Sequence, residues 1–264
     1  RMIGLLFGDT DLPKQILKKI KKNKVKYFII DLSKNKYFKK DPHSQSIGIG
    51  QFGKIFEIFK TNKCNKVLLA GKINKPKFSS LKMDLKGFYY LPSIIKAAKL
   101  GDAAILKVII NILKKNKIKV ISSIAYNPEL VLSRGIYTKA KPNKEDLISI
   151  RKGIESLGRL NPHNHVQGLV IKVNNIISKE TSKGTKKMLQ LISKKKKFKG
   201  ILIKFPKKKQ DLRLDLPTIG LETLKDCKKA LIKGIVLKSK KNIFMDKSKS
   251  ISFANKNRIF IKVL

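Results

Sequence analysis

Two aspartates beside an arginine form the most chemically suggestive cluster in the sequence. Asp211 and Asp215 flank Arg213 in a chain with only 17 acidic residues among 264. Pro217 restricts the preceding residue to an extended conformation, and Thr218 is then expected to cap a helix. The segment therefore predicts that Asp215 lies at a helix N-terminus, where free amides favour phosphate and a carboxylate can hold Mg²⁺ or orient water.

Basic residues near this cluster would neutralise a bound phosphate. Lys204 precedes the cluster at the end of an expected strand, and Arg213 lies within it. The spacing is equally consistent with a structural Asp215 that only pairs with Arg213 near the helix start. Both interpretations remain open from the sequence alone.

Three weaker signals lie elsewhere. The segment 180–185 ends in Gly184 and Thr185 at an expected helix start, which could form a small anion cradle, although a plain turn is the simpler interpretation. The first strand-to-helix crossover, residues 8–13, lacks the GxGxxG glycines of a dinucleotide site. His163 and His165 flank Asn164 next to a proline and are expected to be ordinary loop residues, because no cysteine or acidic cluster accompanies them.

Alternating apolar strands and amphipathic helices predict an α/β fold. We expect an N-terminal Rossmann-like domain with a parallel sheet over residues 1–128, and a C-terminal α/β domain over 136–264 that carries Asp215. The expected strands are 3–7, 25–30, 66–70, 118–122, 165–173, 200–205, 235–237, 243–245 and 259–263, and the expected helices begin near Pro13, Phe52, Asp102, Asn143, Thr185 and Thr218.

Two of these helices carry specific side-chain predictions. Asn143 is expected to cap its helix together with Asp146. The spacing of the apolar residues predicts that Leu147, Ile150, Ile154 and Leu157 line the inner face of the first helix, and that Leu221, Leu224, Cys227 and Leu231 line that of the second.

The net charge of +45 invites an interpretation as a nucleic-acid-binding protein. Only six of the 62 basic residues are arginine, and the lysines are spread over the whole chain, so compositional bias is favoured by about two to one. No uncharged apolar run is long enough to span a bilayer. Two cysteines make neither a disulfide framework nor a zinc site, and residues 2–9 predict a first strand, not a signal peptide, so we expect a cytoplasmic protein.

An ordered set of motifs resembles a known family, the LpxI-type UDP-2,3-diacylglucosamine pyrophosphatases. The most specific of these motifs is Asp-Leu-Pro-Thr-Ile-Gly at residues 215–220. The other motifs that carry the resemblance lie at residues 48–56, 70–71, 75–78, 101–102, 158–160, 167–170, 184–185 and 188–189.

The resemblance implies Mg²⁺-dependent hydrolysis of the pyrophosphate of UDP-2,3-diacylglucosamine to UMP and lipid X, in lipid A synthesis. It also implies a homodimer, and we expect a peripheral contact with the inner-membrane surface. The family's key aspartate matches Asp215, with Gln210, Arg213 and Thr218 in the surrounding motif and Glu180 at an upstream acidic position. The resulting hypothesis assigns Asp215, Asp211 and Glu180 to the metal, and Lys204, Gln210, Arg213, Thr218, Gly184 and Thr185 to the substrate.

The sequence also departs from the family pattern. Lys183 and Lys186 stand where the family usually has acids, residues 161–164 replace an Asp-x-Gly-Gln-like turn, and the first loop has fewer glycines. An alternative is therefore a catalytically weak homologue that binds polyanions, nucleic acid or a nucleotide sugar. Specific nucleic-acid recognition is not expected, because arginine is scarce.

Overall fold

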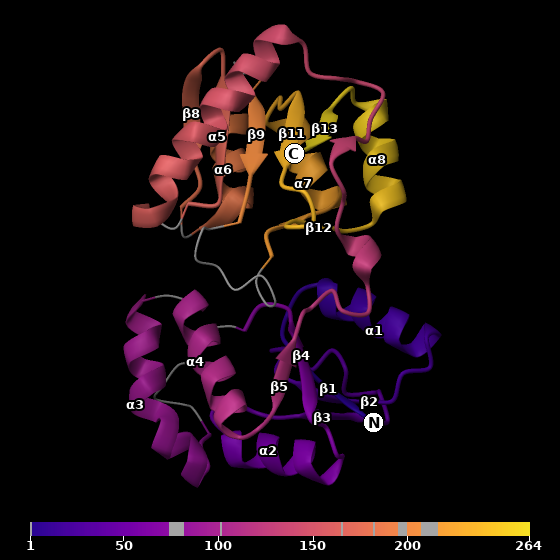
Figure 1. Ribbon diagram of the computed structural model, residues 1–264, viewed down its shortest axis with the longest axis vertical. Helices are drawn as coiled ribbons and strands as arrows, with labels where there is room; N and C mark the ends of the chain where they lie inside the picture. Colours follow the sequence, from indigo (N-terminus) through magenta and orange to yellow (C-terminus); the bar gives the residue numbers. More distant parts are fainter. Residues whose placement is uncertain are drawn as a thin grey trace. The chain divides into compact units, whose positions relative to one another are not determined.

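The computed structural model divides the chain into two compact units, one up to Pro128 and one from Glu129 onward. The structure describes residues 2–73, 82–100, 102–164, 166–181, 183–194, 200–206 and 216–264, with the backbone alone at 102–103 and 161–164. Each unit is built around its own sheet (Figure 1).

The N-terminal unit contains a five-stranded sheet of order β3-β2-β1-β4-β5, in which all neighbouring strands are parallel. This order reverses direction at β1, as in Rossmann-type sheets, so the predicted Rossmann-like fold is confirmed. The elements of this unit are β1 (Ile3–Phe7), α1 (Leu12–Lys22), β2 (Tyr27–Asp31), β3 (Ser44–Ser46), α2 (Phe52–Thr61), β4 (Lys66–Ala70), α3 (Leu85–Leu100), α4 (Asp102–Lys115) and β5 (Lys119–Ile121).

Helices cover both faces of this sheet. Alternate strand residues such as Leu6, Ile30 and Leu69 belong to one apolar cluster with residues of α2, α3 and α4. The intervening residues are buried as well and point to the opposite face, where right-handed crossovers place α1.

The C-terminal unit contains a mixed sheet of order β6-β13-β11-β9-β7-β8 and a parallel pair, β10 and β12. Within the larger sheet β9, β11 and β13 are parallel, whereas β6, β7 and β8 run antiparallel to their neighbours. The elements of this unit are β6 (Gly135–Ile136), α5 (Lys144–Asn164), β7 (Gly168–Lys172), β8 (Asn175–Lys179), α6 (Gly184–Ser193), β9 (Ile201–Lys204), β10 (Thr218–Ile219), α7 (Leu221–Lys229), β11 (Gly234–Leu237), β12 (Ile243–Phe244), α8 (Lys247–Lys256) and β13 (Phe260–Val263).

This sheet is also covered on two sides. Leu169 and Ile203 pack with Ile150 of α5 on one face. The alternate residues Val170 and Leu202 pack with residues of α6, α7 and α8 on the other face. The predicted C-terminal α/β architecture is confirmed, and it positions the ends of β8 and β9 beside the start of α6 (Figure 1).

The predicted capping of α5 is confirmed. The Asp146 amide donates to Asn143 Oδ1 at 2.8 Å, and the Asn143 amide donates to Asp146 Oδ2 at 3.1 Å. Together the two bonds form a reciprocal capping box. Leu147 was predicted to face inward but is exposed, because Ile150 and Leu157 already face the sheet.

The prediction of a helix capped by Thr218 is wrong. Thr218 and Ile219 form β10, which pairs with β12, and α7 begins only at Leu221 with Gly220 as its N-cap. The Thr218 hydroxyl donates instead to the Leu216 carbonyl at 3.2 Å. The prediction for Leu231 is also wrong, because α7 ends at Lys229 and Leu231 is exposed in a left-handed turn.

Helix α3 has no counterpart among the predicted elements, and a single carboxylate joins its start to α2. Asp84 Oδ1 accepts a hydrogen bond from the Gly87 amide at 2.8 Å, and Oδ2 accepts one from the Lys54 amide at 2.9 Å. Burial raises the pKa of Asp84, but the amides of Gly87, Lys54, Gly53 and Lys86 outweigh it and hold the pKa below its ordinary value. Asp84 thus caps the N-termini of two helices.

We expect Asp84→Ala to lower the free energy of unfolding of the N-terminal unit by about 1–2 kcal/mol near neutral pH. Because the folded pKa of Asp84 is depressed, its contribution is complete above the unfolded pKa and is lost as pH falls through the folded pKa. Urea titrations of wild type and variant at neutral and acidic pH would measure this difference. Glu57→Ala removes an exposed carboxylate of α2 and serves as the control. A penalty that persisted unchanged at low pH would contradict the capping role.

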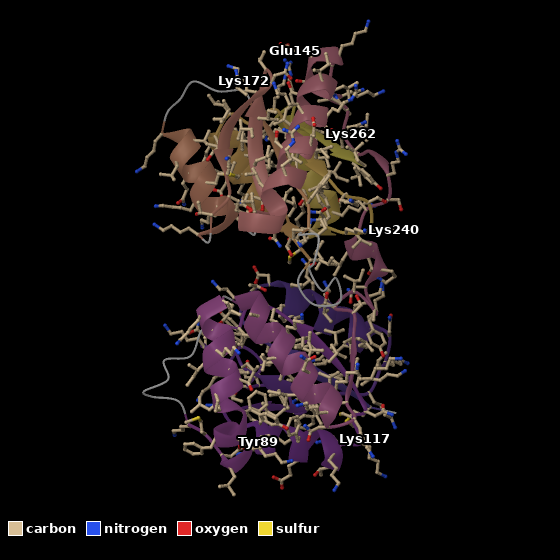
Figure 2. All side chains as sticks on the ribbon, turned by 60° about the vertical axis from the view of Figure 1, so that its left-hand side comes forward. Tyr89, Lys117, Glu145, Lys172, Lys240 and Lys262 are labelled. Atoms are coloured by element: carbon tan, nitrogen blue, oxygen red, sulfur yellow. The ribbon has the colours of Figure 1, made fainter. Side chains whose placement is uncertain are left out.

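Positive charge surrounds both units. Lys117, Lys172, Lys240 and Lys262 illustrate the lysines that extend from the ribbon in Figure 2. With 62 basic residues and 17 acids, most lysines cannot have a carboxylate partner. In the part of the chain that the structure describes, helices long and apolar enough to cross a membrane do not occur.

Candidate functional site

Two predicted site residues meet at one edge of the C-terminal sheet. Lys204 is the last residue of β9, and Glu180 directly follows β8. Strand β7 is antiparallel to both strands, and its first residue Gly168 pairs with Lys204 and accepts a 2.8 Å hydrogen bond from the Glu180 amide. Because β7 begins where β8 and β9 end, Glu180 and Lys204 lie side by side.

The start of α6 completes this cluster. The Lys204 ammonium donates to the Thr185 hydroxyl, which in turn donates to Glu180 Oε1 at 3.1 Å. Lys204 Nζ also lies 3.6 Å from Glu180 Oε1, and the two side chains are only 9% and 10% exposed. A buried ammonium is costly unless a counter-charge is nearby, so Glu180 is what makes the burial of Lys204 tolerable.

The second carboxylate oxygen of Glu180 is free to take a ligand. Glu180 Oε2 is buried without a hydrogen-bond partner among the residues described. It lies 2.8 Å from where a Cβ on Gly168 would be, so only glycine there leaves room for the carboxylate. Buried oxygens normally have partners, and Mg²⁺ prefers carboxylate oxygen. Glu180 therefore fits the role of a magnesium ligand, although no group of three His, Cys, Asp or Glu side chains gathers within the described ranges.

The N-terminus of α6 suits an anion. No side chain caps it, its first turn holds no acidic residue, and the flanking Lys183 and Lys186 are exposed. Gly184 has a φ of +79°, a left-handed conformation that glycine adopts without strain. The amides and the helix dipole thus combine with Lys204 to favour phosphate at this edge.

Thr218 is connected to this cluster through a residue that the sequence did not single out. Asn242 Nδ2 donates to the Lys204 carbonyl at 2.9 Å, and Asn242 Oδ1 accepts from the Lys238 amide at 2.8 Å. The next residue, Ile243, pairs with Thr218. Asn242 is 2% exposed and so fixes the end of β9 next to β10 and β12. An asparagine in a lysine-rich turn carries no sequence signal of such a role.

The remaining predicted residues lie outside the described part of the chain. These are Gln210, Asp211, Arg213 and Asp215, and His165 is a further one. The structure brings together Glu180, Thr185, Gly184 and Lys204, and it links Thr218 to them through Asn242.

The first strand-to-helix crossover of the N-terminal unit, the usual ligand position of such a sheet, is closed by the chain itself. Gly8 and Gly71 follow β1 and β4, where the strand order reverses. Asp9 and Lys72 form a two-way backbone bridge at 2.9 and 2.7 Å across this point. A Cβ on Gly8 would come within 2.4 Å of the Lys72 carbonyl, and one on Gly71 within 2.5 Å of the Asp9 carbonyl. The two glycines therefore allow close backbone packing there.

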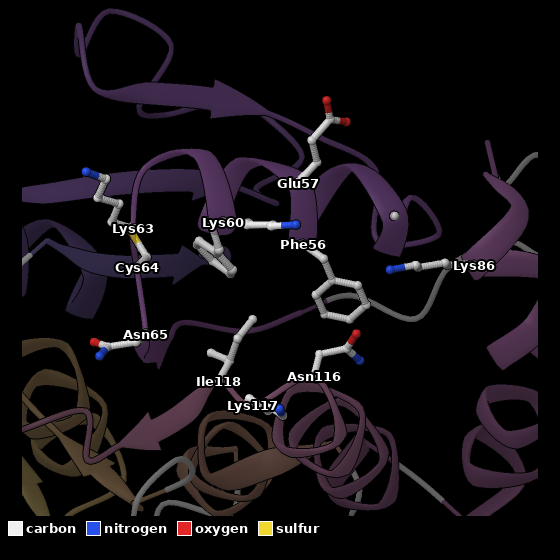
Figure 3. A pocket seen from close by; sticks show the side chains of 12 residues that line it. Phe56, Glu57, Lys60, Lys63, Cys64, Asn65, Lys86, Asn116, Lys117 and Ile118 are labelled. Atoms are coloured by element: carbon white, nitrogen blue, oxygen red, sulfur yellow. The ribbon is translucent and has the colours of Figure 1, made fainter.

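A groove of about 650 Å³ lies at the other end of the strands of this sheet, where β4 and β5 begin (Figure 3). Phe56, Phe59 and Ile118 contribute apolar surface, and Lys86 Nζ lies 5.1 Å from the centre of the Phe56 ring. Burial raises the pKa of the Cys64 thiol to about 11, so this cysteine is protonated and a poor nucleophile. The described lining of the groove holds one carboxylate, Glu57, which is exposed on α2.

Comparison with known proteins assigns the chain to a family. A family model described as the LpxI N-terminal domain matches residues 2–130, and one described as the LpxI C-terminal domain matches residues 133–262. The chain belongs to the LpxI family. The UDP-2,3-diacylglucosamine pyrophosphatase LpxI of Caulobacter vibrioides is 30% identical over 223 residues, which are 81% of this chain and 80% of that protein. The resemblance seen in the sequence motifs is thus confirmed.

Proposed function

We propose that this LpxI-family chain hydrolyses the pyrophosphate bond of UDP-2,3-diacylglucosamine to lipid X and UMP in lipid A biosynthesis, in a Mg²⁺-dependent reaction. The observation that carries the proposal is the match to both LpxI domains along almost the whole chain. The named activity of the Caulobacter vibrioides relative supports the same substrate.

The chemistry requires that negative charge be neutralised, because a nucleophile must approach an anionic pyrophosphate. Lys204 is held in one place by Thr185 and Glu180, and it brings its positive charge to the N-terminus of α6. The Gly184 and Thr185 amides bind phosphoryl oxygens beside it. Arg213, Gln210 and Thr218 are assigned to the substrate on the strength of their motif.

Asp215 orients and deprotonates the attacking water or binds the metal. Glu180, with Asp211 and Asp215, would hold Mg²⁺, which supplies charge neutralisation to the phosphoryl oxygens when bound. Lys183 and Lys186 stand where the family usually has acids, and their exposed ammonium groups add positive charge at this edge. These lysines replace part of the positive charge that Mg²⁺ bound by the family's acids would otherwise supply.

The same proposal places the protein in the cytoplasm, as a homodimer in peripheral contact with the inner membrane. The substrate carries two acyl chains, so the enzyme must meet it at a bilayer surface. The excess of lysine supports such a contact, because anionic headgroups attract basic proteins.

The test is an analysis of the phosphate products from purified protein, UDP-2,3-diacylglucosamine and Mg²⁺, with and without a chelator. We expect UMP and lipid X to form in equal amounts and the chelator to stop their release. Hydrolysis that continues in the chelator would overturn the Mg²⁺ dependence, and intact substrate after incubation with folded protein would overturn the enzymatic proposal.

A second candidate function follows from the net charge of +45, because basic residues far outnumber acidic ones. In this alternative the chain is a catalytically weak homologue that binds polyanions or a nucleotide sugar. Absent hydrolysis together with duplex DNA binding that persists at physiological salt would favour it. Binding that vanishes at that salt would indicate only nonspecific attraction to lysines.

A further inference from the structure

Helix α3 presents an unusual concentration of exposed apolar side chains. Five of the thirteen exposed large hydrophobic residues among those described lie on this one helix of 16 residues. The three most exposed of all are Leu85 at 90%, Tyr89 at 78% and Leu100 at 72%, and Phe88 follows at 59%. Isolated exposed apolar residues are ordinary on proteins, but a cluster on one element indicates a binding surface.

The packing of α3 determines which face is exposed. Its buried residues are mostly small, Gly87, Ala97 and Ala98 together with Ile94, and they face α2 and α4. A Cβ on Gly87 would come within 1.8 Å of the Gly50 carbonyl, so the helix cannot turn a larger residue inward there. Small residues inside and large ones outside invert the usual pattern of a surface helix.

The exposed residues form one continuous stripe. Leu85, Phe88, Tyr89 and Pro92 follow the i, i+3, i+4, i+7 spacing of a single helix face. We define this stripe as the α3 apolar face.

The charges around this face select its partner. Lys86, Lys96 and Lys99 lie on α3, which contains no acidic residue. Asp84, the acid that directly precedes α3 in the sequence, is bound to the Lys54 and Gly87 amides. A contact between two copies through this face would bring the lysines of two α3 helices together without acids of α3 to balance them, whereas an apolar layer with an anionic surface would attract them.

We propose that the α3 apolar face docks onto an anionic lipid bilayer, with α3 lying in the headgroup region. Phe88, Tyr89 and Leu85 enter the acyl boundary, and Lys96 and Lys99 extend their ammonium groups to lipid phosphates. The proposal rests on the proposed function, because it explains how the protein reaches a substrate held in a membrane by acyl chains. The membrane contact is then made by one helix, and not by a general attraction between the bilayer and all the lysines of the chain.

The absence of tryptophan from the sequence allows a direct test. Phe88→Trp places one fluorophore on the α3 apolar face, and Tyr37→Trp places one at a site in the same unit that is 46% exposed. The probe is a phosphatidylcholine vesicle containing phosphatidylglycerol, at high salt to screen the lysines. We expect a blue shift and quenching by brominated acyl chains for Phe88→Trp only. Equal behaviour of the two variants would overturn the proposal.

Alternative occupants of the face give different outcomes in the same assay. A blue shift that depends on protein concentration without vesicles would assign the face to self-association. A shift of the same size with polyglutamate, a polyanion without acyl chains, would assign it to an acidic protein. Either result would overturn docking onto lipid.

A second variant separates docking from catalysis. We expect Phe88→Ser/Tyr89→Ser to weaken vesicle binding roughly a hundredfold, because each side chain contributes about tenfold. Turnover of detergent-dispersed substrate should be unchanged, while turnover of vesicle-embedded substrate falls. Unchanged vesicle binding would overturn the proposal. If wild type binds vesicles through the α3 apolar face yet hydrolyses neither form of substrate, the proposed function fails while the docking surface stands.

Discussion

Replacing Lys204 by methionine is expected to lower the free energy of unfolding of the C-terminal unit by about 3 kcal/mol. The ammonium group is buried between Thr185 and Glu180, so its removal leaves the Glu180 carboxylate in the interior without a counter-charge. Urea unfolding followed by far-ultraviolet circular dichroism measures the change, since the chain has no tryptophan to report it. The loss should appear in the transition of the C-terminal unit alone.

A double-mutant cycle tests whether the two charges are coupled. We expect Glu180→Gln/Lys204→Met to cost about 2 kcal/mol less than the sum of the two single substitutions, because neither charge is then left alone. Lys186→Met, an exposed lysine in the first turn of α6, is the matched control and should change stability by less than about 0.5 kcal/mol. Additive penalties would contradict a coupled buried pair.

Asp215→Ala is expected to reduce turnover on the order of a thousandfold or more while leaving the melting temperature almost unchanged. The expectation rests on the match of Asp215 to the key aspartate of the family motif. A steady-state assay of UMP release and a thermal scan of the same samples measure both quantities.

Glu222→Gln provides the control for removal of an acid. Glu222 is an exposed residue of α7 that pairs with Lys225 at 2.7 Å. Its variant should keep normal turnover. An Asp215→Ala enzyme with wild-type activity would show that another group positions the water.

Apolar periodicity was sufficient to locate most of the regular structure. The strands at 3–7 and 66–70 occur as predicted, and α2 and α4 begin where their apolar stripes begin. Both sheets are covered on two faces, so their central strands, such as β1 and β11, are continuously apolar and easily distinguished from amphipathic helices.

Errors arose where a local signal competed with tertiary pairing. Thr218 has the residue type and position of a helix cap, but pairing with Ile243 draws it into β10. Helix α3 escaped prediction because its small residues face inward and its large residues face outward, which weakens the usual periodic signal, and because Pro92 lies inside it.

The sequence by itself determined the α/β class, the two-part organisation of the elements and the family, since these depend on local periodicity and on motif order. It singled out Lys204 as a candidate phosphate ligand by its place at the end of an expected strand, but it could not show that this ammonium is buried beside Glu180 and Thr185. Only the tertiary structure did so. The antiparallel register of β7 with β8 and β9 brings residues 168, 180 and 204 together, and α6 adds Thr185 to them. Burial and charge pairing depend on such contacts between distant residues, and no local pattern encodes them.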